Sequence, residues 1–231
     1  MRAILFPGQG SQAVGMGKVL AEAFAPARDV FAEVDEALSQ NLSRLMWEGP
    51  ADELTLTENA QAAIMAVSMA VVRVLEQAGF DWAKHAKFVA GHSLGEYSAL
   101  AAAGSFTLAD TARLLKIRGQ AMQAAVPVGA GAMSALIGVE LDFAEAVAAE
   151  AVAAATEANP LCVVANDNAP GQVVISGLAA TVARAGEIAK AKGAKRVVPL
   201  TVSAPFHSPL MKPAAEKMAE ALAAVQVLAP R

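Results

Sequence analysis

The stretch Gly91-His92-Ser93-Leu94-Gly95 decides the fold of this chain. It follows a predicted strand at 87–90 and precedes the helix-compatible segment 96–102, so it predicts a serine on a tight turn from a strand into a helix. The glycines on either side permit the strained backbone that such a turn imposes. The N-terminus of the following helix would stabilise a negative charge that forms beside the serine. This pattern is typical of a serine nucleophile in acyl chemistry.

The composition indicates a globular protein without a nucleic-acid or membrane partner. The 231 residues are 55% hydrophobic, enough to bury the core of one large domain or two small ones. The net charge is −4 and no basic run exceeds two residues, which argues against nucleic acid and against a membrane surface. The alanine-rich stretch 60–75 contains Gln61 and Arg73 within a helical pattern. We expect a cytoplasmic monomer.

The inventory of metal-binding residues is small. Cys162 is the only cysteine and the chain has three histidines. A disulfide within the chain is therefore excluded, and a metal cluster would have no sulfur partner. We expect neither a metal site nor a bound redox cofactor.

Strand and helix signals divide the chain into two α/β parts. In the first part we expect strands at 2–6 and 87–90 and helices at 16–38, 57–78 (opened by Thr57) and 107–125. In the second part we expect the order β-α-β-β-α-β, at 132–139, 142–155, 161–166, 172–177, 179–192 and 195–200.

This order predicts a ferredoxin-like unit inserted into a larger domain. The larger domain, residues 1–126 and 201–231, would be α/β-hydrolase-like, with a parallel sheet and the serine turn. The smaller domain would comprise residues 127–200. A cleft between the two is a common place for a substrate.

A nucleophilic serine needs a base, and the chain offers His85, His92 and His207. His92 adjoins the serine on a tight turn, and His85 lies in a polar segment that indicates a surface position. His207 comes just past the last strand of the insert, between Pro205 and Pro209. We therefore expect His207 to act as the base.

Six short motifs follow one another along the chain, at 6–12, Gln61, 91–97, 118–122, 166–172 and 203–208. Together they resemble the malonyl-CoA:acyl carrier protein transacylases, an acyltransferase family of fatty acid and polyketide synthesis. The resemblance implies ping-pong transfer of a malonyl group from malonyl-CoA to the phosphopantetheine thiol of acyl carrier protein, for fatty acid biosynthesis. It implies Ser93 as nucleophile, His207 as general base and acid, and the backbone N–H groups of Gln9 and Leu94 as the oxyanion hole.

The same resemblance assigns Arg118 to the free carboxylate of the malonyl group. Taken alone, Arg118 also fits a solvent-facing arginine that extends from an apolar helix face. A guanidinium pairs bidentately with a carboxylate, so it would select malonyl over acetyl groups. The resemblance also implies that the large side chain of Phe206, directly before His207, leaves little volume for an extra methyl group at the malonyl α-carbon and favours malonyl over methylmalonyl, although an ordinary buried phenylalanine fits this position too. Further residues that the resemblance suggests line or brace the site are Gln61, Asn166, Gln172 and Met122.

A basic cluster leads toward His207 and comprises Lys190, Lys192, Lys195 and Arg196. Because the resemblance implies an acidic carrier protein as partner, Lys195 and Arg196 are candidates for docking it. A solvated helix end, where cations complement the helix dipole, explains the cluster equally well.

Two other function classes remain open at this point. A serine thioesterase or esterase would share Ser93 and His207 but release the acid to water. A non-catalytic module that binds the carrier protein would dock without turnover. The family's pattern runs on beyond Arg231 and includes a carbonyl that orients the histidine, so we expect this chain to be part of a longer protein or to be completed by another chain.

Overall fold

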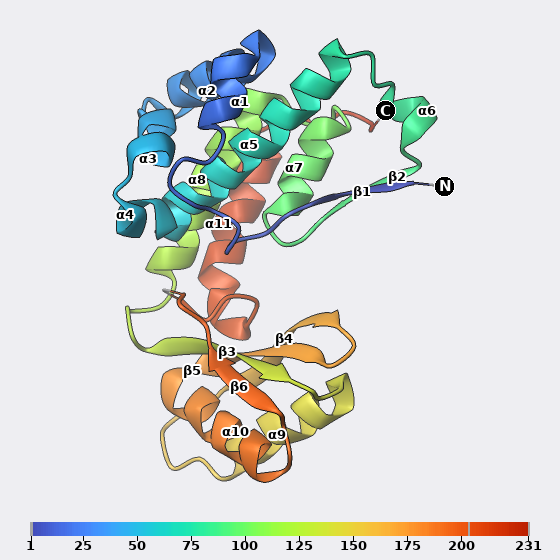
Figure 1. Cartoon of the computed structure of the whole chain (residues 1–231). Helices are drawn as coiled ribbons and strands as arrows, with labels where there is room; N and C mark the ends of the chain where they lie inside the picture. The colour runs from blue at the N-terminus through green and yellow to red at the C-terminus, as the bar shows by residue number, and fades with distance from the viewer. Residues whose placement is uncertain (1, 203, 231) are drawn as a thin grey trace. The chain divides into compact units, whose positions relative to one another are not determined.

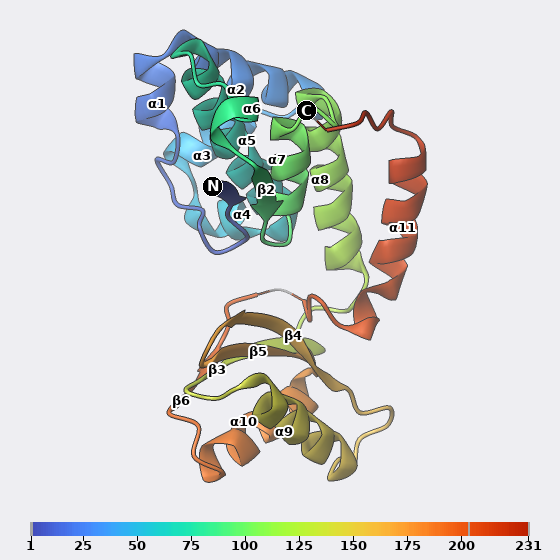
Figure 2. The ribbon, with the colours of Figure 1, turned by 90° about the vertical axis from the view of Figure 1, so that its right-hand side faces the viewer.

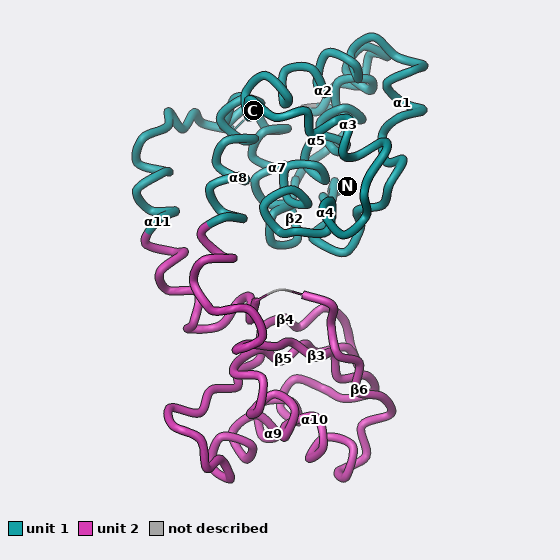
Figure 3. The backbone as a smooth tube through the Cα atoms, turned by 90° about the vertical axis from the view of Figure 1, so that its left-hand side faces the viewer, with its two compact units in different colours: residues 1–120, 217–231 teal, residues 121–216 magenta. Residues whose placement is uncertain are grey.

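The computed structural model describes residues 2–202 and 204–230. They form two compact units, which Figure 3 shows in different colours. Unit 1 comprises residues 1–120 and 217–231, and unit 2 comprises residues 121–216.

Unit 1 is built on two parallel strands, β1 (Ala3–Phe6) and β2 (Phe88–Gly91), which run side by side in Figure 1. Their register pairs Ala3 with Phe88 and Phe6 with Gly91, so the segments that follow the two strands leave the sheet at the same end. The helices of the first 120 residues are α1 (Lys18–Ala23), α2 (Ala25–Leu38), α3 (Leu42–Glu48), α4 (Ala51–Thr55), α5 (Thr57–Gln77), α6 (Trp82–His85), α7 (Gly95–Ala102) and α8 (Leu108–Ala124). The helix α8 runs past residue 120, and a last helix, α11, spans Lys212–Ala223.

Helix α5 is the centre of the core of unit 1. Gln61, Met65 and Met69 are buried on it, and α2 packs against it. Among the described residues, α5 is the one helix with the length and mean hydropathy of a membrane span, and 61% of that window is buried inside the protein. A core helix of a globular protein has the same properties.

The expected helix at 16–38 is wrong as a single element. It breaks at Phe24, whose backbone is extended, and α2 begins directly afterwards with Pro26 in its first turn. Proline lacks the N–H that a continuing helix needs, but it fits the first turn of a new one. The short helices α3, α4 and α6 were not predicted, since they have only 7, 5 and 4 residues and are too short for a helical period to stand out in the sequence.

Unit 2 has the predicted β-α-β-β-α-β order. Its elements are β3 (Gly131–Ile137), α9 (Leu141–Ala153), β4 (Cys162–Ala169), β5 (Gln172–Leu178), α10 (Ala179–Ala191) and β6 (Arg196–Pro199). The strands form one antiparallel sheet in the order β4-β5-β3-β6. Helices α9 and α10 lie on one face of this sheet (Figure 2).

Side chains that alternate along the strands fill the two faces of the sheet. Leu136 and Ile175 point into the core beneath α9 and α10. Met133 belongs to a cluster on the other face, together with Met122 and Phe206. Unit 2 therefore contains more residues than the expected insert, 121–216 against 127–200. The added segments, before residue 127 and after residue 200, cover the second face of its sheet.

Candidate active site

Ser93 lies on the predicted turn between β2 and α7 and has a left-handed backbone, with φ of 55°. The flanking glycines make this turn possible. A Cβ on Gly91 would lie 1.8 Å from the carbonyl carbon of Gly95, and a Cβ on Gly95 would lie 2.4 Å from the carbonyl oxygen of Phe6. A side chain at Gly91 would therefore force the turn itself open, and one at Gly95 would push the turn away from β1.

The backbone of the turn ends at the N-terminus of α7. Gly95 N–H donates to the carbonyl of His92 at 3.0 Å, and Glu96 N–H donates to that of Ser93 at 3.1 Å. The N–H of Leu94 precedes both donors, at the end of the helix where the dipole favours negative charge. The turn thus carries an amide suited to an oxyanion beside Ser93.

The loop after β1 starts at the same end of the sheet as the serine turn. His92 N–H donates to the carbonyl of Phe6 at 3.0 Å, which ties the two segments together. Within the loop, Gly10 N–H donates to Gln12 Oε1 at 2.8 Å, which holds the chain directly after Gln9. The structure therefore places the loop that contains Gln9 next to the turn that contains Ser93.

Arg118, on α8, contacts the serine directly. Its Nη2 donates to Ser93 Oγ at 3.1 Å, and its Nη1 donates to Gln61 Oε1 at 2.6 Å. The guanidinium also lies 5.8 Å from the centre of the Tyr97 ring, within range of a cation–π interaction. Burial lowers the pKa of Arg118 from its ordinary value, while Tyr97 and Glu96 oppose this shift. The guanidinium therefore contacts Ser93, Gln61 and Tyr97, and Arg118 is not a purely solvent-facing arginine.

Two residues without a predicted role at the site, Thr57 and Tyr97, contact its polar groups. Gln61 Nε2 donates to Thr57 Oγ1 at 2.9 Å, and Thr57 Oγ1 donates to Gln9 Oε1 at 2.9 Å. Thr57 is the first residue of α5, as expected, but its hydroxyl does not cap the helix, since the N-cap is Leu56 and has no side-chain capping bond. A sequence signal did exist, since positions 57 and 61 are four apart and face the same side of a helix.

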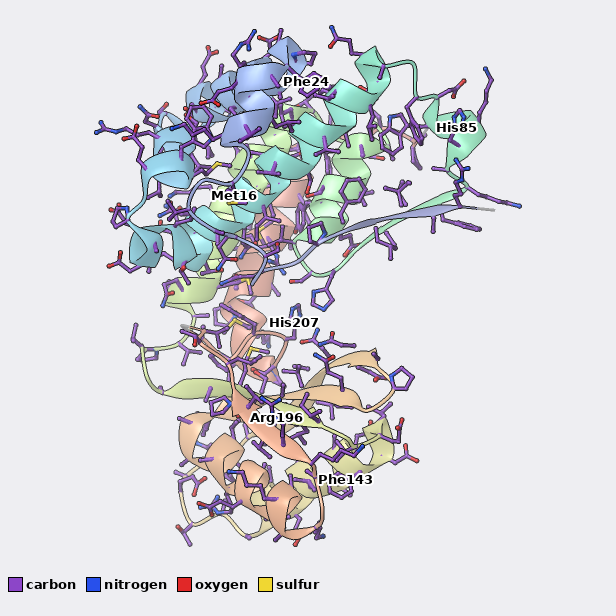
Figure 4. All side chains as sticks on the ribbon, viewed as in Figure 1. Met16, Phe24, His85, Phe143, Arg196 and His207 are labelled. Carbon is purple, nitrogen blue, oxygen red and sulfur yellow. The ribbon has the colours of Figure 1, made fainter. Side chains whose placement is uncertain are left out.

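Unit 2 carries His207, which lies on the segment between β6 and α11 (Figure 4). It is exposed and follows the buried residues Pro205 and Phe206. Ser208 Oγ donates to the carbonyl of Pro205 at 2.8 Å and closes the turn around the histidine. Ser203, the first residue of the predicted motif 203–208, lies outside the described residues.

Ser93 and His207 share an uncommon backbone conformation. Each has φ of 55°, and among the described residues only two other non-glycine residues have positive φ. Such conformations cost free energy and concentrate at functional sites. The predicted nucleophile and the predicted base are therefore both held in strained turns.

The remaining predicted site residues lie in unit 2. Met122 and Phe206 belong to one buried cluster, Asn166 is half-buried in β4, and Gln172 is exposed at the start of β5. Lys195 precedes β6 and Arg196 begins it, and both are exposed.

The other two histidines are exposed, and the cysteine is buried. His85 is exposed, as expected, with Nδ1 2.8 Å from the carbonyl oxygen of Asp81. His92 is exposed on the turn, where its ring lies against the backbone of Gly8. Burial raises the pKa of the Cys162 thiol to about 11. Within residues 2–202 and 204–230, no three His, Cys, Asp or Glu side chains are grouped as a metal ion would require.

Comparison with known proteins places this geometry in a family. Residues 4–231 match the acyl transferase domain. The malonyl CoA-acyl carrier protein transacylase of Bacillus subtilis is 49% identical over 225 residues, which cover 97% of this chain and 68% of that protein. The chain belongs to the malonyl-CoA:acyl carrier protein transacylase family. The resemblance seen in the six motifs is thereby confirmed.

Solved structures of this family have the same fold. The acyl-carrier-protein S-malonyltransferase from Bartonella henselae is 61% identical, with a TM-score of 0.95 over 100% of this chain and 72% of that chain. A malonyl-transacylase in complex with a type II polyketide acyl-carrier protein gives 43% identity and a TM-score of 0.92, over 99% of this chain and 71% of that chain. These matches confirm the predicted α/β fold with a parallel sheet.

Proposed function

We propose that this chain transfers a malonyl group from malonyl-CoA to the phosphopantetheine thiol of acyl carrier protein, for fatty acid biosynthesis. The observation that carries the proposal is the 3.1 Å contact between Arg118 Nη2 and Ser93 Oγ. A cation at this distance from the attacking oxygen suits an acyl group whose free carboxylate is one methylene away from its thioester carbon. The names of the relatives, malonyl transacylases with acyl carrier protein as acceptor, support the same substrate pair.

The first half-reaction acylates the serine. His207 accepts the proton of Ser93 Oγ as this oxygen attacks the thioester carbon, and the backbone N–H groups of Gln9 and Leu94 hold the oxyanion. Collapse of the tetrahedral intermediate breaks the carbon–sulfur bond, and the coenzyme A thiolate leaves with the proton from His207.

The second half-reaction runs the same steps in reverse order with a different thiol. His207 accepts the proton of the phosphopantetheine thiol, and the thiolate attacks the malonyl-serine. The bond to Ser93 Oγ breaks, and the oxygen recovers the proton from His207. One histidine thus serves as base and acid in both halves, and the proposal requires no bound cofactor.

Specificity follows from the groups around the acyl chain. Arg118 exchanges its contact with Ser93 Oγ for the malonyl carboxylate, and acetyl groups offer it no such partner. Phe206 limits the volume at the malonyl α-carbon, and Asn166, Gln172 and Met122 line the same acyl site. Exposed cations at Lys195 and Arg196 dock the acidic carrier protein.

The domain assignment belongs to the same proposal. We assign residues 1–126 and 201–231 to an α/β-hydrolase-like catalytic domain and residues 127–200 to a ferredoxin-like insert, whose flanking segments 121–126 and 201–216 pack with it in unit 2. The strand order β4-β5-β3-β6, with α9 and α10 on one face, supports the ferredoxin-like part. We assign the enzyme to the cytoplasm, as a monomer.

Incubation with labelled malonyl-CoA, with and without holo-acyl carrier protein, tests this function against its alternatives. Transfer predicts label on the protein alone and then on the carrier when the carrier is added. A thioesterase would release free malonate, and Arg118 would then hold no carboxylate during turnover. A binding module would retain the carrier without taking up label, and either of these results would contradict the proposal.

A further inference from the structure

Thr57 occupies the middle of a hydrogen-bonded chain inside unit 1. Its side chain is fully buried at the start of α5. Its hydroxyl donates to Gln9 Oε1 and accepts from Gln61 Nε2, both at 2.9 Å. The chain continues from Gln61 Oε1 to Arg118 Nη1 at 2.6 Å and from Arg118 Nη2 to Ser93 Oγ at 3.1 Å.

The direction of each bond in this chain is fixed by chemistry. A hydroxyl has one hydrogen, so the hydrogen that Thr57 gives to Gln9 leaves only its lone pairs to face Gln61. Gln61 must then present its NH2 group to Thr57 and its oxygen to Arg118. A reversed amide would set N–H donors against a guanidinium, which has no acceptor.

Tight packing fixes α5 and α8, the two helices that carry most of these hydrogen bonds, relative to each other. A Cβ on Gly119 would lie 2.4 Å from Glu58 Cα and 2.7 Å from the carbonyl oxygen of Thr57. The backbone of α8 next to Arg118 therefore rests directly on the backbone of α5 next to Thr57. Neither helix has room to slide, so the hydroxyl of Thr57 meets Gln61 at a fixed place.

We propose that Thr57 is a positioning residue that couples the Gln9 loop to Arg118. This inference rests on the proposed function, in which that loop supplies an oxyanion donor and Arg118 holds the malonyl carboxylate. Thr57 touches neither the acyl group nor Ser93 in the chain of bonds. It acts by fixing the amide of Gln61, and with it the guanidinium, relative to the loop that stabilises the transition state.

Three variants separate this role from ordinary core packing. Thr57→Val keeps the shape of the side chain but removes the hydroxyl, and Thr57→Ser keeps the hydroxyl. Thr111→Val is the matched control, because Thr111 is also fully buried. Its hydroxyl donates to the backbone carbonyl of Thr107, four residues earlier, at 2.6 Å. The assay is kcat/KM for malonyl-CoA and for acetyl-CoA, with thermal unfolding measured beside it.

We expect Thr57→Val to lower kcat/KM for malonyl-CoA by roughly tenfold to a hundredfold, as for the loss of buried hydrogen bonds that position a charged group. We expect the ratio of kcat/KM for malonyl-CoA to kcat/KM for acetyl-CoA to fall as well. Thr57→Ser restores both values, and Thr111→Val leaves the ratio unchanged. A wild-type ratio in Thr57→Val, with a stability loss like that of Thr111→Val, would show that Thr57 only fills space.

A second measurement does not depend on turnover. Hydrogen exchange of the Arg118 guanidinium, followed by NMR with Arg118→Lys to assign the signal, reports whether its bonds are held. We expect faster exchange in Thr57→Val and unchanged exchange in Thr57→Ser and Thr111→Val. Unchanged exchange in Thr57→Val would overturn the positioning role, whereas wild-type protein that takes up no malonyl group would overturn the proposed function and leave this readout standing.

Discussion

Arg118 Nη2 lies 3.1 Å from Ser93 Oγ, so a guanidinium sits within hydrogen-bond distance of the proposed nucleophile. The guanidinium is the donor, and the bond uses a lone pair of Oγ and not its proton. A malonyl carboxylate would compete with Oγ for this cation because it offers two charged acceptors in the plane of the fork. In the proposed function, this resting contact lies where the malonyl carboxylate is recognised.

Arg118→Ala is expected to reduce kcat/KM for malonyl-CoA about 100-fold to 1,000-fold and to affect acetyl-CoA far less, because only the malonyl group pairs with the guanidinium. Arg118→Lys recovers only part of the loss, since an ammonium cannot make two parallel bonds. Steady-state kinetics with both thioesters measures this. Arg113→Ala, an exposed arginine on the same helix, is the control. Equal losses for the two substrates would make Arg118 a structural residue.

His207→Ala is expected to slow acylation of the serine by roughly 10²- to 10⁴-fold, the usual contribution of a general base. Rapid-quench measurement of malonyl-enzyme formation gives the rate directly. His85→Ala serves as the control because His85 lies exposed on α6, away from the serine turn. Acylation at the wild-type rate in His207→Ala would remove the histidine from the mechanism.

Local pattern was enough to predict the serine turn, because its requirements lie within five residues. Gly91 and Gly95 are needed for contacts inside the turn and with the adjacent strand, and a strand and a helix flank it as expected. The break at Phe24 was missed because an apolar helical period continues across it in the sequence. Periodicity does not report where one helix stops and the next begins.

The long-range contacts of Thr57 were beyond the reach of local reasoning. Its hydroxyl bonds to Gln9, 48 residues earlier in the chain, and to Gln61, whose own partner Arg118 is 57 residues further on. The bond to Gln61 follows the four-residue spacing within α5, but the bond to Gln9 and the bond from Gln61 to Arg118 join segments far apart in the sequence, which no spacing within one element encodes. Threonine at a helix start most often reads as a cap, and here tertiary contacts use its hydroxyl instead.

Phe206→Ala is expected to raise the use of methylmalonyl-CoA relative to malonyl-CoA, since it opens volume where the proposal places the α-carbon. Phe206 is buried in a cluster with Met122 and Met133, so the same change costs about 3–5 kcal/mol of stability. The ratio of kcat/KM values is therefore measured well below the unfolding temperature. Met133→Ala, in the same cluster, controls for loosened packing, and an equal ratio in both variants would contradict a role of Phe206 in selecting the acyl group.

Reversal of Lys195 and Arg196 to glutamate is expected to slow transfer to the carrier protein and to flatten its salt dependence, while acylation by malonyl-CoA stays nearly unchanged. Exposed charges at the rim of an interface act mainly on the rate of encounter. The second half-reaction is measured from preformed malonyl-enzyme over a range of ionic strength. Reversal of Arg44 and Lys84, exposed cations of unit 1, changes the net charge equally and controls for it. An unchanged transfer rate at low salt would leave only the helix-end explanation for the cluster.

The central claim is that malonyl-CoA acylates Ser93. Intact mass spectrometry of the protein after incubation with malonyl-CoA, without an acceptor thiol, tests it most directly. The wild-type protein and Ser98→Ala, which loses a buried hydroxyl on α7, are expected to gain the mass of one malonyl group, located on the peptide with Ser93, while Ser93→Ala gains none. A malonyl group that persists on Ser93→Ala would contradict the account.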